Sequence, residues 1–318
     1  MKVYITDNIP ESAAILLKKN NIDYKTYKKK SPISKEELIR NCKSADGIIS
    51  MLSNPFDKEV ISSLKNCKVI ANYAVGFNNI DLQAAKEKNI VVTNTPDILT
   101  DATADLAMAL VLACARRIGE GEKLVREEKF VGWKPLLLLG IDLKDKTFGI
   151  IGAGRIGQAT ARRAKAFGSK IIYFNKSKKY DFEKEVGAKK VKLETLLKTS
   201  DIISIHLPLN DKTANLLNKS NMHLMKSTAI LINTARGEII DENVLIQMLK
   251  KKKLFSAGLD VYEGEPNVKK GLLKLKNVVL LPHVGTGTIE TRARMAELTA
   301  KNVVNVLKGK KPLTPVVF

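Results

Sequence analysis

The string GAGRIG at residues 152–157 has the glycine spacing of a turn that binds the diphosphate of a dinucleotide. An apolar run at 147–151 precedes it, and apolar residues recur at helical spacing over 158–167. Between a strand and a helix, the first glycine permits a tight turn, the second lets the backbone approach a diphosphate, and the third lets helix and strand pack closely. The helix N-terminus offers N–H groups to the anion. The string therefore predicts a dinucleotide site.

Two further side chains with useful chemistry each follow an apolar strand. These are Arg236 and His283, and both fall at the sheet edge where α/β proteins bind ligands. An arginine fork matches a carboxylate with two hydrogen bonds, and a histidine can donate a proton near neutral pH. Of the other histidines, His223 has polar neighbours and should be exposed, whereas His206 should line a cofactor pocket or lie satisfied in the core.

The residues after the second strand of a dinucleotide-binding unit bear on which cofactor it takes. In NAD enzymes an acidic side chain there accepts hydrogen bonds from the ribose 2′-hydroxyl. The corresponding stretch, 174–178, has the sequence FNKSK and contains no carboxylate. Lys176 and Lys178 could pair with a 2′-phosphate, and Asn175 and Ser177 could donate hydrogen bonds to it. We therefore expect NADP(H) to be favoured, with NAD(H) possible.

The elements that must position these residues form two α/β groups. In the first, strands are expected at 3–6, 47–51, 69–73 and 91–93, with helices at 11–19, 35–41 and 81–88. A long helix is expected at 101–115, and it should pack closely on a neighbouring element or on another subunit. An irregular stretch follows at 129–144. The second group then has strands at 147–151, 170–174, 202–206, 229–233, 257–260 and 278–281. Six strands is the number expected of a doubly wound nucleotide-binding sheet. A last helix is expected at 290–307.

Composition narrows the class of protein. The chain has 318 residues, 44% of them hydrophobic, and a formal charge of +21. Its lysines are dispersed rather than gathered with aromatic residues, so we expect no nucleic-acid partner. There is no opening leader pattern or long apolar stretch, so we expect a cytoplasmic chain with no membrane partner. The three cysteines have no metal-ligand spacing, so we expect reduced thiols and no metal site.

Three strings in order resemble the signature of the D-2-hydroxyacid dehydrogenase family. They are NTARGE at 233–238, GLDVYEGEP at 258–266 and LPHVG at 281–285. Two more strings, NYAVGFNNID at 72–81 and VTNTPD at 92–97, most resemble the glyoxylate and hydroxypyruvate reductase branch. The resemblance implies a Rossmann-type doubly wound parallel sheet, residues 99–285, inserted into a smaller flavodoxin-like α/β substrate domain made of residues 1–98 and 286–318. It also implies a homodimer with contacts within 101–141.

The resemblance also implies roles for individual residues. Arg236, Glu265 and His283 would be catalytic, with Glu265 pairing with the imidazole of His283 and favouring its protonated form. Leu52, Ser53, Val75 and Gly76, with Arg236, would bind the substrate. The expected cofactor contacts, including those of the glycine turn, are Thr103, Gly152, Gly154, Arg155, Ile156, Gly157, Asn175, Lys176, Ser177, Leu207, Pro208, Thr234, Ala235, Asp260 and Gly285.

These roles amount to the reduction of a small 2-keto acid, glyoxylate or hydroxypyruvate, to the D-2-hydroxy acid. A cation must hold the carboxylate and polarise the carbonyl, an acid must protonate the new alkoxide, and NAD(P)H must deliver hydride to one face. Arg236 and His283 fit the first two tasks. Other activities stay open: a dehydrogenase of 3-phosphoglycerate or of another D-2-hydroxy acid, or an NAD(H)-sensing corepressor-like binding protein.

Overall fold

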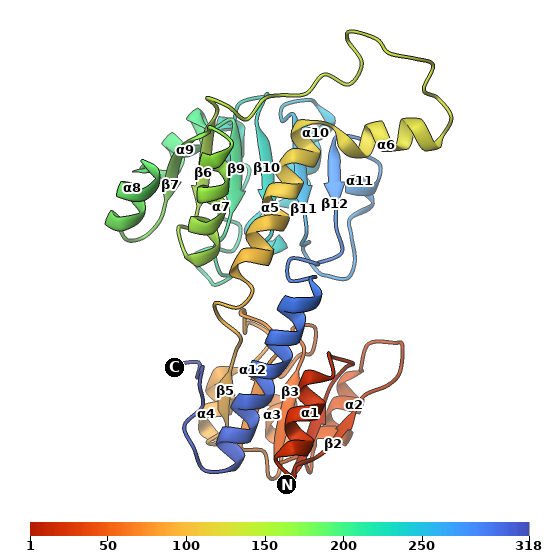
Figure 1. Ribbon diagram of the computed structural model, residues 1–318, viewed down its shortest axis with the longest axis vertical. Coiled ribbons are helices and arrows are strands. Elements are labelled where there is room, and N and C mark those ends of the chain that lie inside the picture. Colours follow the sequence, from red (N-terminus) through yellow and green to blue (C-terminus); the bar gives the residue numbers. More distant parts are fainter. Residues whose placement is uncertain (318) are drawn as a thin grey trace. The chain divides into compact units, whose positions relative to one another are not determined.

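The computed structural model describes residues 1–317, which divide into two compact units. Unit 1 comprises Met1–Leu99 and the described part of Thr286–Phe318, and unit 2 comprises Thr100–Gly285. Each unit is an α/β layer structure built on its own parallel sheet, as expected for the fold class (Figure 1).

Unit 1 contains a five-stranded parallel sheet in the order β2-β1-β3-β4-β5. The strands are β1 (Lys2–Ile5), β2 (Asp23–Thr26), β3 (Gly47–Ser50), β4 (Val69–Asn72) and β5 (Val91–Thr93). This is the flavodoxin-like strand order, and its direction reverses between β1 and β3. Residues alternate between the two faces of a strand, so Ile48 packs into one apolar cluster and Ile49 into the other.

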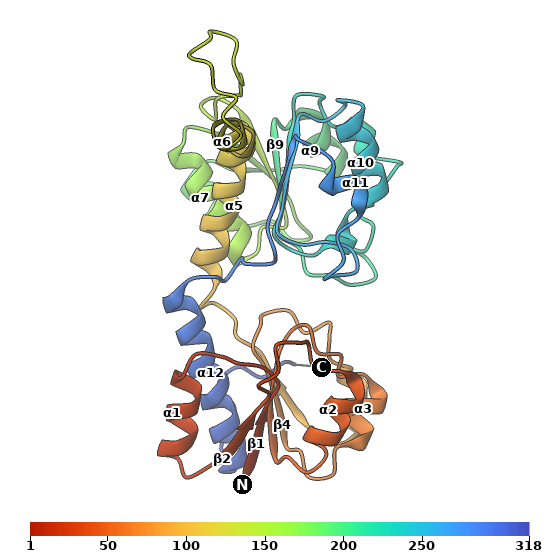
Figure 2. The same cartoon turned by 90° about the vertical axis from the view of Figure 1, so that its right-hand side faces the viewer.

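Helices cover both faces of this sheet. They are α1 (Ser12–Lys19), α2 (Lys35–Cys42), α3 (Lys58–Ser63), α4 (Leu82–Glu87) and α12 (Ile289–Leu307). Figure 2 shows α1 and α12 on one side of the sheet and α2 and α3 on the other. The last helix therefore packs against the sheet built by the start of the chain, where Val303 and Leu307 join the same cluster as Ile49.

Unit 2 contains a seven-stranded parallel sheet in the order β12-β11-β10-β9-β6-β7-β8. The strands are β6 (Thr147–Ile151), β7 (Lys170–Phe174), β8 (Lys189–Lys190), β9 (Ile202–Ile205), β10 (Ile230–Asn233), β11 (Ser256–Leu259) and β12 (Val278–Leu280). Strands β6 to β11 follow the doubly wound order, and β12 extends it. Because β6 lies between β7 and β9, the glycine turn after β6 is at the point where the order reverses.

The helices of unit 2 also lie on both faces of its sheet. They are α5 (Thr100–Ala115), α6 (Ile118–Arg126), α7 (Arg155–Ala166), α8 (Tyr180–Val186), α9 (Leu193–Thr199), α10 (Glu242–Lys250), α11 (Lys270–Leu273) and two short 3₁₀ turns, Met222–Leu224 and Gly237–Ile239. Figure 2 shows α5 and α7 on one side and α9, α10 and α11 on the other. One apolar cluster fills each side.

Several sequence-based expectations for these elements were wrong. The count of six strands in the second sheet missed β8, a strand of only two lysines, and β2, with the sequence DYKT, was missed in the first sheet. Both lie at sheet edges, where one face stays polar and the apolar pattern is weak. Helix α6 was also missed. The small-residue helix α5 packs on α7 and on β10 and β11 of its own unit, so its composition needs no second subunit.

Candidate active site

The glycine turn of unit 2 has the geometry that a diphosphate requires. Gly152 has a φ of +99°, and a Cβ there would lie 2.7 Å from the carbonyl oxygen of His206. A Cβ on Gly157 would lie 2.0 Å from the carbonyl oxygen of Gly152, so only glycine lets α7 approach the turn. At Gly154, by contrast, no atom lies within 4 Å of a Cβ position, and no side chain caps α7. The turn is therefore tightly packed at Gly152 and Gly157 and open at Gly154, where a phosphate would bind the N–H groups of the first turn of α7.

Asn175 ties the turn to the end of β7. Its Oδ1 accepts a hydrogen bond from the N–H of Ala153 at 3.2 Å, and its Nδ2 donates to the carbonyl oxygen of Ser177 at 2.9 Å. Lys176 is exposed beside it. Lys178 instead pairs with Glu183 at 3.3 Å, so one of the two lysines expected to meet a 2′-phosphate already has an anionic partner.

The segments after β9 and β10 lie along the same sheet edge. Leu207 approaches the turn, since its Cδ2 would lie 2.9 Å from a Cβ on Gly152, and exposed Pro208 follows it. After β10, Asn233 accepts from the N–H of Ala235 at 3.0 Å. The hydroxyl of Thr234 is buried without a hydrogen-bond partner among the described residues. An orphaned buried hydroxyl on the same sheet edge as the turn fits a bound polar group.

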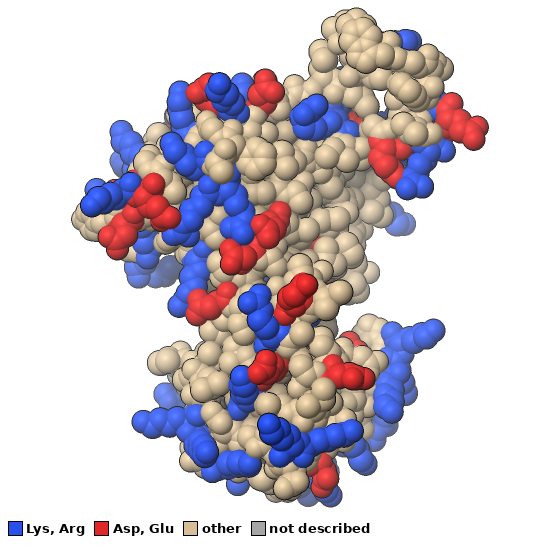
Figure 3. All heavy atoms as spheres, in the orientation of Figure 1, with Lys and Arg blue, Asp and Glu red and all other residues tan. Residues whose placement is uncertain are grey.

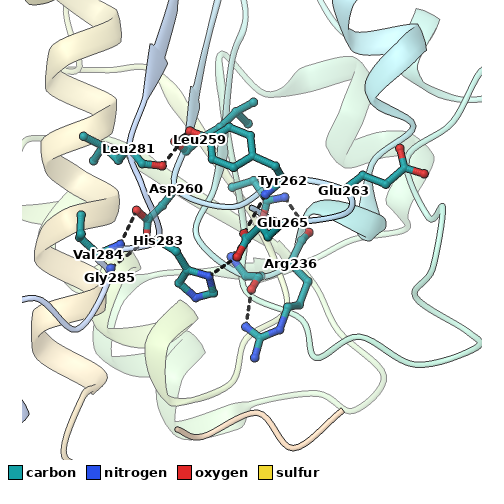
Figure 4. A network of polar contacts seen from close by, with 12 residues as sticks. Arg236, Leu259, Asp260, Tyr262, Glu263, Glu265, Leu281, His283, Val284 and Gly285 are labelled. Carbon is teal, nitrogen blue, oxygen red and sulfur yellow. Dashed lines mark hydrogen bonds and ion pairs between the residues drawn. The ribbon is translucent and has the colours of Figure 1, made fainter. Parts of the chain in front are cut away.

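His283 and Glu265 form a hydrogen-bonded pair. The Nδ1 atom of His283 lies 2.7 Å from Oε2 of Glu265, and the N–H of Tyr262 donates to the other carboxylate oxygen at 3.0 Å. Burial raises the pKa of Glu265, but the hydrogen bond and charge of His283 outweigh it, so the pKa lies below its ordinary value. With Nδ1 bound to an ionised carboxylate, Nε2 is the ring nitrogen left to exchange a proton with a ligand (Figure 4).

Asp260 holds the backbone around His283. His283 has a φ of +53°, in the left-handed region that costs most residues free energy. The carboxylate of Asp260 accepts the N–H groups of Val284 at 2.7 Å and Gly285 at 2.8 Å. Thr103 lies close by, because its side chain would be 3.6 Å from a Cβ on Gly285. Strain at a single well-held residue is typical of functional sites.

Arg236 enters the site from the next segment of the sheet edge. Its Nη1 donates to the carbonyl oxygen of Ala235 at 2.6 Å, and Figure 4 shows it beside Glu265 and His283. Burial lowers the pKa of Arg236, and the carboxylates of Glu265 and Glu238 oppose that effect. An arginine remains charged under such conditions, so the site holds a fixed cation next to an acid–base pair.

The loop carrying Glu265 is fixed to the segment carrying Arg236 in two ways. A Cβ on Gly237 would lie 1.9 Å from the carbonyl carbon of Tyr262, so the two backbones touch. Glu242, only 2% exposed, accepts the N–H of Glu263 at 2.8 Å. Burial raises the pKa of Glu242, partly offset by that N–H group. Sequence reasoning missed Glu242, since an acid in the first turn of a helix is ordinary there.

In unit 1 the four residues expected to bind substrate lie on two loops after β3 and β4. A group of asparagine side chains holds these loops. Asn94 donates to the carbonyl oxygen of Val75 at 2.9 Å, and Asn72 to that of Gly76 at 2.7 Å. Asn79 donates to the carbonyl oxygens of Met51 and Asn54, on either side of Leu52 and Ser53. Sequence reasoning missed these asparagines, although several fall within the strings quoted for the resemblance.

Comparison with known proteins decides the family. Residues 108–285 match the family model described as D-isomer specific 2-hydroxyacid dehydrogenase, NAD binding domain. A glyoxylate reductase from Thermococcus litoralis is 47% identical over 315 residues, covering 98% of this chain and 95% of that protein. The chain belongs to the D-isomer specific 2-hydroxyacid dehydrogenase family. It is thus a nicotinamide-dependent oxidoreductase, and its relatives place it in the glyoxylate reductase branch, as the sequence strings indicated.

Solved structures similar to this chain cover both of its units. A protein from Thermus thermophilus is 42% identical, with a TM-score of 0.94 and 100% coverage of both chains. An NADPH-dependent glyoxylate/hydroxypyruvate reductase from Sinorhizobium meliloti, in complex with NADP and malonate, is 29% identical, with a TM-score of 0.88 and coverage of 99% of this chain and 96% of that one. The two-domain α/β fold predicted from the sequence is therefore confirmed.

The other two histidines of this dehydrogenase lie outside the His283–Glu265 pair. His206 is partly buried and bonds to Ser204 at 2.8 Å, and burial lowers its pKa to about 3, so its imidazole is neutral. His223 is exposed, as expected. Within residues 1–317 no cluster of His, Cys, Asp or Glu could hold a metal ion. Nor does any helix in that range have the length and apolar character needed to cross a membrane.

Proposed function

We propose that this enzyme reduces glyoxylate to glycolate, which is achiral, or hydroxypyruvate to D-glycerate. The observation that carries the proposal is the 2.7 Å contact between His283 and Glu265, with the cation of Arg236 beside it. An acid–base pair next to a fixed cation matches the needs of a 2-keto acid: a carboxylate to hold and an alkoxide to protonate. The glyoxylate reductase from Thermococcus litoralis supports this choice of substrate.

Each residue has a defined part in the proposed step. The guanidinium of Arg236 pairs with the substrate carboxylate and polarises the neighbouring carbonyl. Nε2 of His283 donates its proton to the carbonyl oxygen while the carbonyl carbon gains a hydride, and Glu265 keeps Nδ1 protonated. The nicotinamide cofactor supplies that hydride when bound. Unit 2 is the proposed cofactor domain and unit 1 the proposed substrate domain, with Leu52, Ser53, Val75 and Gly76 as its contacts.

NADPH is the proposed electron donor. Residues 175–180, directly after β7, include no carboxylate, Lys176 is exposed there, and Asn175 connects that loop to the glycine turn. The Sinorhizobium meliloti structure, which holds NADP, supports the same cofactor. Cofactor contacts are proposed for the open front of the turn, at Gly154, Arg155 and Ile156, and for the orphaned hydroxyl of Thr234.

Initial-rate kinetics tests both parts of this proposal. Glyoxylate, hydroxypyruvate, 3-phosphohydroxypyruvate and a bulkier 2-keto acid are each assayed with NADPH and with NADH. We expect the highest kcat/KM for glyoxylate or hydroxypyruvate with NADPH, and a chiral assay should show the D-isomer of glycerate from hydroxypyruvate. A preference for 3-phosphohydroxypyruvate would instead assign a phosphoglycerate activity. No turnover of any 2-keto acid would overturn the enzyme proposal in favour of a cofactor-sensing binding protein.

We also propose a homodimer, because one segment of unit 2 exposes many apolar side chains. Residues 116–140 leave and rejoin the unit at one point, where the N–H of Ile141 donates to the carbonyl oxygen of Ala115 at 2.9 Å. Trp133 is 83% exposed and Leu136 79%. Residues 130–140 contain one charged residue, Lys134, and Figure 3 shows mostly uncharged atoms at the outer end of this segment. Such a surface is typical of a protein–protein interface. Light scattering should give twice the chain mass, and Trp133→Lys with Leu136→Lys should give monomers; a monomeric wild type would refute the dimer.

A cytoplasmic location is the last part of the proposal. Cys42, Cys67 and Cys114 are all buried free thiols, which suits a reducing compartment. Cell fractionation with an antibody to the protein tests this, since recovery outside the cytoplasmic fraction would contradict it.

A further inference from the structure

An open pocket of about 480 Å³ lies where β7 and β8 end. Its lining residues are Phe174, Asn175, Lys176, Lys190, Val191 and Lys192. The two strands are parallel neighbours, with Tyr173 paired to Lys190, so their carboxyl ends meet at one edge of the sheet. The pocket therefore draws its basic residues from two separate segments, the loop after β7 and the end of β8.

The three lysines of the pocket converge. Lys190 is half-buried, and its Nζ donates to the carbonyl oxygen of Lys176 at 3.1 Å, which holds its ammonium group beside the loop after β7. Lys192 lies two residues further on, directly before α9. None of the lining residues is acidic, so within the lining the three positive charges are uncompensated. A pocket of this kind attracts a multiply charged anion.

The acidic residues near the pocket already have partners. Glu183 accepts a hydrogen bond from the hydroxyl of Tyr173 at 2.8 Å and pairs with Lys178 at 3.3 Å. Glu194, in the first turn of α9, pairs with Lys198 at 2.6 Å. Lys178 is thus occupied in neutralising Glu183, whereas Lys190 and Lys192 line the pocket together with Lys176.

We propose that Lys190 and Lys192 complete, with Lys176, a binding site for the 2′-phosphate on the adenosine ribose of the cofactor. The inference rests on the proposed cofactor binding at the glycine turn, because the ribose of a dinucleotide bound there lies at the end of the second strand of the unit, which is β7. A phosphate dianion offers several acceptor oxygens to three ammonium groups. A ribose with a free 2′-hydroxyl gains little from those charges.

Calorimetry on the full chain with two small nucleotides tests the site. The ligands are 2′,5′-ADP and 5′-AMP, which differ only by the 2′-phosphate, and the variants are Lys190→Met and Lys192→Met. We expect each variant to lower the affinity for 2′,5′-ADP about tenfold, as for the loss of one charge-assisted hydrogen bond, and to leave 5′-AMP binding unchanged. Lys189→Met is the matched control: Lys189 is exposed on the same strand but does not line the pocket, so both affinities should stay at the wild-type level.

The outcomes separate this inference from the proposed function. If the wild type prefers 2′,5′-ADP and both methionine variants keep that preference, the assignment of Lys190 and Lys192 is overturned while NADPH use stands. If the wild type binds both nucleotides equally, the NADPH preference falls as well, and glyoxylate reduction with NADH would still be measured independently. Lys190→Arg should keep most of the affinity for 2′,5′-ADP, and its failure to do so in a folded variant would also count against the site.

Discussion

The carboxylate of Asp260 fixes the backbone that carries His283. Its two oxygens accept the N–H groups of the next two residues, Val284 and Gly285, at 2.7 and 2.8 Å. Burial raises the pKa of Asp260, but these N–H groups and the charge of His283 favour the ionised form. His283, the proposed proton donor, has an unusual backbone conformation with a φ of +53°. That conformation is held by the buried carboxylate of Asp260, which follows β11, the strand next to β12.

Replacing Asp260 by asparagine should therefore damage both stability and turnover. An amide retains one acceptor oxygen but presents an NH₂ group to the second N–H, which then loses its partner. We expect a loss of about 1–3 kcal/mol in the free energy of unfolding, together with a lower kcat. Urea unfolding and initial rates measure the two effects. Tyr262→Phe is the control, because it removes a different buried hydrogen bond near His283, the one from the Tyr262 hydroxyl to the carbonyl oxygen of Leu281. If Asp260→Asn left kcat unaffected, the two hydrogen bonds that Asp260 accepts would not be needed for catalysis.

His283 can be tested with its backbone conformation held constant. Asparagine accepts the left-handed region better than most residues, so His283→Asn removes the acid with little added strain. We expect kcat to fall about 10²–10⁴-fold, the usual contribution of general acid catalysis, with the Kd for NADPH unchanged. His283→Ala should lose similar activity and about 1 kcal/mol more stability than the asparagine variant. Retained kcat in His283→Asn would exclude this histidine as the proton donor.

The Glu265 carboxylate should make stability depend on pH in a definite direction. Folding lowers the pKa of Glu265. Burial alone would raise this pKa, but the hydrogen bond and the charge of His283 lower it by more. The ionised group therefore contributes stability above the ordinary pKa of glutamate, and that contribution is lost as the pH falls through the lowered value in the folded state. The difference in unfolding free energy between wild type and Glu265→Gln should shrink between pH 6 and about pH 3. Equal pH dependence in both proteins would contradict the pairing. Because the side chain is about a third exposed, the effect should be modest.

Glu242 should act as a positioning residue for the loop that carries Glu265. Glu242→Gln keeps an oxygen that can accept the N–H of Glu263, and it removes a buried charge whose pKa is raised by burial, so stability near neutral pH should be maintained or improved. Glu242→Ala leaves that N–H unpaired, and we expect a loss of about 1–3 kcal/mol. If the loop positions Glu265, the alanine variant should also shift the pH profile of kcat, whereas a purely structural role would leave the profile in place.

Arg236 should show the requirements of its planar fork. Arg236→Ala should lower kcat/KM for the 2-keto acid at least about 100-fold and raise KM, because its contacts strengthen as negative charge develops. Arg236→Lys keeps the charge without the two-pronged geometry, so we expect only partial recovery. Cofactor affinity, measured by fluorescence titration of NADPH, should remain near wild type in both. If lysine restored full activity, charge alone would explain the role of Arg236.

Local sequence was sufficient to predict where the main residues of the candidate site lie in the fold. The spacing in GAGRIG determines a turn between strand and helix, and the structure closes that turn with Gly152 and Gly157 as expected. Arg236 and His283 each follow an apolar strand, and parallel strands present their carboxyl ends at one edge. Periodicity and chain order therefore predicted that these residues would share an edge, because both properties are encoded within a few consecutive residues.

Only the tertiary structure decided which partners those residues meet. β8 consists of two lysines, so nothing in its pattern shows that Lys190 and Lys192 share a pocket with Lys176 across a strand pair. Asp260 accepts two backbone N–H groups and Glu242 accepts one, and these hydrogen bonds likewise join residues about twenty positions apart. Such contacts depend on how strands lie side by side and how loops return to them, which a side-chain pattern of period two or 3.6 does not specify.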